Sequence, residues 1–181
     1  MINDDLKEFI GEVCDILKIP IQNISDDFSA FKNNTRMAML AIENNVPTLY
    51  LSARMETEHD YYFAVAHELR HLWQYLTNEK YWLGGYKTAE EIGITAYNRQ
   101  RLEIDANAFA ALIMVLSFGM VPTFPSLDLE TRHMIEVRAR QIMPELDDWI
   151  SKMEFSEKLT KKSRFRKCEI FSFWNFRLFI P

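Results

Sequence analysis

The spacing of apolar residues predicts both helices and strands in the first third of the chain. Over residues 3–17 the apolar positions recur every three or four residues, which is typical of an amphipathic helix. Residues 35–52 alternate instead, around Asn44-Asn45, and this pattern predicts a β-hairpin. The second arm, 47–52, begins at a proline whose missing N–H is tolerable there, and this arm is a candidate for an exposed edge of the sheet.

Longer helical patterns follow the hairpin. The first should begin at a cap formed by Thr57 and Asp60 and continue to about Asn78. Three glycines predict a loop over 80–94, or a loop with one short turn. Further helices are predicted over 95–117, 127–142 and 144–158, the last two separated by a proline. Together these elements predict an α+β fold, in which a small antiparallel sheet packs on helices.

Length and composition describe one ordinary globular protein. The chain has 181 residues, 48% of them hydrophobic and 26% charged, which is enough for a single domain over residues 1–160. The net charge of −5 gives no reason to expect a nucleic-acid partner. Cys14 and Cys168 lack the spacing of a thiolate metal site. The start of the chain lacks the features of a secretory signal, and no apolar run reaches the roughly 18 residues of a membrane span. We therefore expect a cytoplasmic protein without a transmembrane segment.

The clearest chemical signal is the motif H-E-x-x-H at residues 67–71, inside the helix predicted to reach Asn78. His67 and His71 are four residues apart, so both imidazoles project from one helical face and can reach one metal ion. Glu68 directly follows the first histidine, where it can take a proton from a metal-bound water. Without a metal, the histidines would be buried polar groups paired with carboxylates, and Glu68 an ordinary salt-bridge partner.

A catalytic zinc site needs a third protein ligand. The residues after His71 lack the glycine and histidine of one known continuation of the motif, so a carboxylate on a later helix is the alternative. The helix over 95–117 offers Glu103 and Asp105, which point about 200° apart, so only one of them can face the histidines. Small residues flank Glu103, which favours it. Asn107, one turn further on, could hydrogen-bond to a ligand histidine.

The segments HELRH and EIDANAFA resemble the two motifs of the gluzincin metallopeptidases. They are similar to the ImmA/IrrE-type peptidases and to the minigluzincins, the single-domain relatives of the Ste24/HtpX-type peptidases. The resemblance covers roughly residues 37–115 and implies a zincin-like domain. Carried over residue by residue, it implies that zinc is held by His67, His71 and Glu103, that Glu68 is the general base, and that Asn107 supports a histidine.

This resemblance implies a zinc metalloendopeptidase that acts on a peptide or protein substrate, which would bind along a strand edge. The alternative is a regulatory or binding protein of the ImmA type, which keeps the metal site and acts on a single target or on none. The chain also departs from the ImmA/IrrE pattern, because residues 111–115 lack its usual proline.

Two further histidines and the last segment are less informative. His59 is expected at a helix start as a cap or surface residue rather than as a ligand, and His133 is expected to be exposed on a helix, with contact to a substrate or oxyanion as the weaker alternative. The tail, 161–181, has a basic cluster followed by aromatic residues. It is expected to pack on protein, including a second copy of the chain, in preference to lying on an anionic membrane surface.

Overall fold

The structure is a computed structural model, and it describes residues 3–20, 23–27, 31, 37–43, 46–52, 58–147 and 150–151. The chain divides into two compact units, Met1–Tyr86 and Lys87–Pro181, and each is described in turn. The predicted single domain over 1–160 stays a prediction. Among the described residues, no helix is both long and apolar enough to cross a membrane.

The first unit begins with the predicted amphipathic helix, α1 (Asp4–Leu17). Its N-terminus is capped by Asn3, whose side chain accepts a hydrogen bond of 2.8 Å from the backbone N–H of Leu6. Its C-terminus ends at Lys18, which adopts the left-handed conformation with φ of 54°. The apolar face is buried, and Phe9 packs against Tyr62 with ring centroids 4.7 Å apart.

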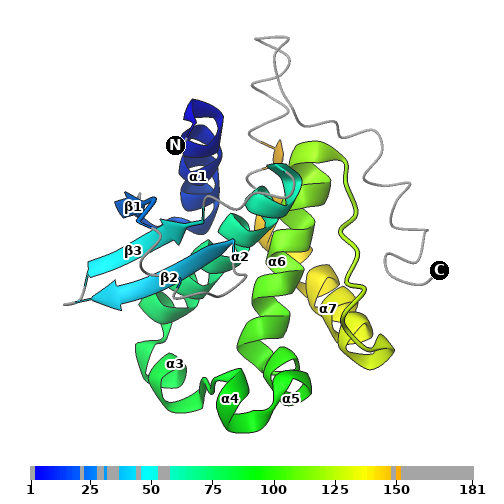
Figure 1. Ribbon diagram of the computed structural model, residues 1–181. Coiled ribbons are helices and arrows are strands. Elements are labelled where there is room, and N and C mark those ends of the chain that lie inside the picture. Colours follow the sequence, from blue (N-terminus) through cyan, green and yellow to red (C-terminus); the bar gives the residue numbers. More distant parts are fainter. Residues whose placement is uncertain are drawn as a thin grey trace. The chain divides into compact units, whose positions relative to one another are not determined.

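A three-stranded sheet follows (Figure 1), with strands β1 (Asn23–Ser25), β2 (Ala38–Glu43) and β3 (Val46–Leu51). The hairpin prediction is confirmed, because β2 and β3 pair antiparallel. The sheet is nevertheless mixed, since β1 pairs parallel with β3. The strand order is β1-β3-β2, so the expectation that 47–52 forms an exposed edge is wrong. A strand of three residues is too short to show alternation, which is why the sequence did not reveal β1.

The long helix α2 (Glu58–Thr77) continues the first unit, and α3 (Glu79–Gly85) ends it. An apolar stripe of Val65, Leu69, Leu72 and Leu76 recurs at helical spacing along α2; its first three residues are completely buried, whereas Leu76 is 48% exposed. The apolar stripe faces the rest of the first unit, where α2 contacts α1, β2 and β3. The histidines of the motif consequently project away from the stripe.

The second unit contains α4 (Ala89–Ile92), α5 (Ile94–Asn98), α6 (Arg101–Phe118), α7 (Leu129–Ile142) and the 3-10 turn η2 (Met143–Leu146). The prediction of a loop over 80–94 is wrong, because α3, α4 and the start of α5 occupy it. Caps explain the difference. Asn78 accepts a hydrogen bond from the N–H of Tyr81 at the start of α3, and Thr88 forms a capping box with Glu91 at the start of α4.

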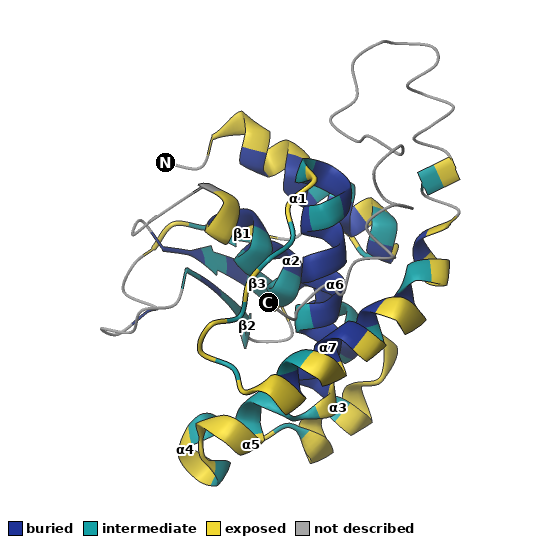
Figure 2. Ribbon diagram, turned by 90° about the vertical axis from the view of Figure 1, so that its right-hand side faces the viewer, coloured by how far each residue is buried: buried dark blue, intermediate teal, exposed yellow. Residues whose placement is uncertain are grey.

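Helix α6 is shorter than the predicted 95–117 because Gln100 has an extended backbone, with φ of −60° and ψ of 140°, and separates it from α5. It ends at Gly119, whose φ of 65° suits a glycine. Most residues of α6 are buried on every side, as the dark blue ribbon of Figure 2 shows, whereas α3, α4 and α5 contain no buried residue. The helix packs against α7 and is therefore the core of the second unit.

The remaining predictions concern α7, η2 and segments outside the described residues. Helix α7 begins after the cap Asp128 and confirms the helix predicted over 127–142. Pro144 lies in the first turn of η2, so a break at this proline is confirmed. The hairpin turn at Asn44-Asn45, the cap at Thr57, most of 144–158 and the tail 161–181 lie outside the described residues.

Candidate metal centre

The two histidines of the motif lie one turn apart on α2, as their spacing predicts. His67 is half-buried and His71 is 4% exposed. Their ring centroids are 4.6 Å apart, and the rings meet edge to face at 89°. Because an α-helix places residues i and i+4 on the same face, this part of the site follows directly from local geometry.

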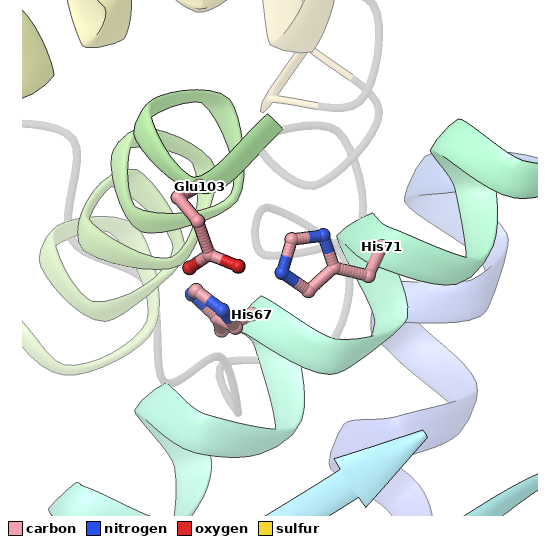
Figure 3. A group of neighbouring side chains, drawn as sticks. All are labelled: His67, His71 and Glu103. Atoms are coloured by element: carbon pink, nitrogen blue, oxygen red, sulfur yellow. The ribbon is translucent and has the colours of Figure 1, made fainter. Parts of the chain in front are cut away.

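Glu103, in the first turn of α6, is the carboxylate that accompanies the histidines. It is 3% exposed, and its side chain points toward His67 and His71 (Figure 3). Each of the three residues offers one ligand atom, and these atoms all lie within 4.8 Å of one another. The three residues that the sequence pointed to are therefore brought together.

Asp105 has a different partner, as expected for the acid on the other face of α6. Its Oδ1 accepts a hydrogen bond of 2.7 Å from Nε of Arg138 on α7, and the second guanidinium nitrogen lies 2.6 Å away. The carboxylate is mostly buried, at 6% exposure, so the ion pair compensates for lost solvation. Asp105 thus joins α6 to α7, and Glu103 remains the acid beside the histidines.

The donor set suits a zinc ion. Two imidazoles and one carboxylate are a usual protein ligand set for catalytic zinc, with one position left for water. In a tetrahedral site with bonds of about 2.0–2.1 Å, neighbouring ligand atoms are about 3.4 Å apart. The observed limit of 4.8 Å exceeds this by less than about 1.5 Å.

Glu68 is held by the sheet. Its Oε2 accepts a hydrogen bond of 3.0 Å from the backbone N–H of Leu40 on β2. The backbone N–H of Ser52 donates to the carbonyl of Met37, so Met37 and Ser52 form a hydrogen-bonded pair. From this pair onward, hydrogen-bonded and non-hydrogen-bonded pairs alternate along β2 and β3. Leu40 pairs with Leu49 at a non-hydrogen-bonded position, and its N–H therefore points away from β3, off the edge of the sheet. The sequence reasoning missed this contact, because nothing in the sequence gives the strand order.

Arg70, the other charged residue of the motif, is 2% exposed and stacks its guanidinium over the Trp73 ring at 3.9 Å. A charge this well buried is stabilised by its contact with an aromatic face.

A further residue contacts His71 from the same helix. Oε1 of Gln74 lies 2.8 Å from Nδ1 of His71, and both side chains are buried. Gln74 stands three residues after His71, a spacing that places two helical residues side by side, so this contact could have been predicted from the sequence. Asn107, which the resemblance assigns to this kind of support, is half-buried on α6, and its role stays a prediction.

The remaining histidines are exposed, as expected. His59 is exposed in the first turn of α2. His133 is exposed on α7, and its Nδ1 lies 4.0 Å from Oε2 of Glu136 on the same helix. Both are surface residues.

Comparison with known proteins adds no family. No protein-family model matches the chain, and no match to it is found among curated proteins or solved structures.

Proposed function

We propose that this protein is a zinc-dependent peptidase. The observation that supports the proposal is the grouping of His67, His71 and Glu103, with ligand atoms within 4.8 Å of one another, next to a glutamate that accepts a hydrogen bond from β2. A purely structural metal site has no use for a carboxylate next to an open coordination position. The resemblance of HELRH and EIDANAFA to the gluzincin motifs supports the same conclusion.

The proposed chemistry divides between the metal and one side chain. A zinc ion held by the three ligands would act as a Lewis acid toward the attacking water and the scissile carbonyl. Glu68 would accept a proton from the water and deliver it to the leaving amine. The hydrogen bond from Leu40 occupies only Oε2 of Glu68, so Oε1 remains to receive the proton.

The substrate is proposed to bind along the free edge of β2. In the register of the hairpin, Ala38, Leu40 and Ile42 occupy the positions whose N–H and carbonyl groups point away from β3. An extended peptide can add to such an edge as a further strand. The N–H of Leu40 is taken by Glu68, so a peptide would pair with the other outward-pointing groups of this edge and would run next to the proposed base. This assignment replaces the edge predicted at 47–52.

A second candidate is a regulatory or binding protein that retains the metal and cleaves nothing. The same contact favours it, because a carboxylate that accepts an N–H from β2 also joins α2 to the sheet. In that case Glu68 would be needed for stability alone.

Metal analysis and cleavage assays on the same preparations test the proposal. The purified chain should contain one zinc ion, and His67→Ala should lose it. His59→Ala is the matched control, since this histidine lies on the same helix but is exposed in its first turn. Cleavage is measured on an unbiased peptide mixture by mass spectrometry. Zinc bound equally by all three proteins would refute the site, and zinc binding without any cleavage would favour the regulatory candidate.

A further inference from the structure

The imidazole of His71 is buried among other side chains. Its Nδ1 lies 2.8 Å from Oε1 of Gln74, and the two residues are only 4% and 6% exposed. On other sides, ring centroids lie 5.1 Å away at Trp82 and 5.9 Å away at Tyr86, and these two rings stack on each other at 4.7 Å. All these residues belong to the first unit.

This arrangement determines which nitrogen of His71 carries the proton. A neutral imidazole has one N–H donor and one acceptor nitrogen, and the amide oxygen of Gln74 can only accept a hydrogen bond. The contact is therefore made when Nδ1 carries the proton. In that tautomer the lone pair that can bind a metal is on Nε2, the nitrogen farther from the helix backbone.

We propose that Gln74 is a positioning residue that selects this tautomer of His71 and so presents Nε2 to the metal. The inference rests on the proposed function, because it concerns the same metal centre. Trp82 and Tyr86 pack against the ring at interplanar angles of 65° and 68°, which limits its rotation about the bond to Cβ. His71 and Gln74 are both buried, and a hydrogen bond shielded from water is electrostatically stronger than an exposed one.

Gln74→Met is the informative variant, because methionine has nearly the length of glutamine but lacks the amide oxygen. Gln74→Glu restores an acceptor. Thr77→Val is the matched control, because this exposed polar residue of α2 bonds only to helix carbonyls, at 2.7 Å from that of Trp73. Metal-free thermal unfolding of each variant shows whether the fold is kept.

The first measurement needs no metal. Nitrogen-15 NMR of the histidine side chains at mildly alkaline pH, where a free imidazole is neutral, reports which nitrogen of His71 is protonated. The native chain, Gln74→Glu and Thr77→Val should show the Nδ1–H tautomer, and Gln74→Met should shift the population toward Nε2–H. An Nε2–H tautomer in the native protein would overturn the inference, whatever the protein does with metal.

The second measurement is zinc affinity, by competition with a chelating dye. Loss of a partner of this kind lowers metal affinity by about 10–100-fold, so we expect that loss in Gln74→Met and near-native affinity in Gln74→Glu and Thr77→Val. If the native chain binds zinc and Gln74→Met binds it equally well, the inference is wrong and the proposed function stands. If Asn107→Leu lowers affinity and Gln74→Met does not, the supporting role belongs to Asn107. A native chain that binds no zinc overturns both proposals.

Discussion

Replacing Glu68 by glutamine separates its proposed catalytic role from its structural one. The side chains have the same shape, and the amide oxygen can still accept the N–H of Leu40 that Oε2 accepts at 3.0 Å. We therefore expect Glu68→Gln to lose at most the difference between a charged and a neutral hydrogen bond, about 1 kcal/mol of unfolding free energy. Glu68→Ala also leaves the Leu40 N–H without this acceptor and should be less stable than Glu68→Gln.

The effect on catalysis should be much larger. An amide cannot accept the proton of the attacking water, and a positioned general base typically contributes about 10²–10⁴ to the rate. This range corresponds to about 2.7–5.4 kcal/mol in the activation free energy. Because the base acts on the transition state, the loss should appear in kcat, with little change in KM. Zinc content should stay native, since Glu68 is not among the grouped ligand residues.

The assay uses a peptide that the native chain is first shown to cut. Steady-state kcat and KM, zinc content and thermal unfolding are measured for the native chain, Glu68→Gln and Glu79→Gln. Glu79 is an exposed residue whose carboxylate accepts a hydrogen bond from Tyr75, so its variant controls for the loss of one charge. If Glu68→Gln retains native kcat with full zinc content, Glu68 is not the base and the proposed mechanism is wrong.

Three other predictions concern the surroundings of the site and the second unit. Leu40→Pro removes the N–H that holds Glu68 and should lower kcat about tenfold or more. Ile42→Pro, at an equivalent outward position of the same edge strand, should lower kcat less. Equal kcat values for the two variants would contradict a positioning role for Leu40. Glu103→Ala should abolish stoichiometric zinc binding in equilibrium dialysis, while Asp105→Asn should lower the melting temperature and keep the zinc. Zinc lost in Asp105→Asn and kept in Glu103→Ala would show that Asp105 is the ligand and Glu103 the structural acid. Hydrogen bonds from the backbone N–H and then the hydroxyl of Thr131 lower the pKa of Asp128 from 3.8 to about 2. The ionised form of Asp128 therefore stabilises the native state above about pH 4, and this contribution is lost as pH falls through 2. Urea unfolding from pH 7 to 2 should then show Asp128→Asn to be less stable at neutral pH, with the difference vanishing at the acid end; a difference independent of pH would show that the charge does not matter.

Features that depend on residues close together in the sequence were predicted correctly. The amphipathic helix α1 and the hairpin β2–β3 follow from apolar spacing, and the shared face of His67 and His71 follows from helix geometry. The same geometry separated Glu103 from Asp105, because helical residues two positions apart point about 200° apart wherever the helix lies. The short helices within 80–94 were not predicted, because the glycines of this segment favour a loop, although the caps Asn78 and Thr88 favour helix starts.

Tertiary structure decided the contacts between distant segments. The position of β3 in the centre of the sheet depends on its pairing with β1, and this pairing leaves β2 at the edge with the Leu40 N–H pointing outward. Only then can that N–H meet Glu68, which is 28 residues away in the sequence. The grouping of Glu103 with the two histidines is of the same kind. Periodicity indicates which face of an element is apolar, but the partner of a polar group is determined by which elements pack together.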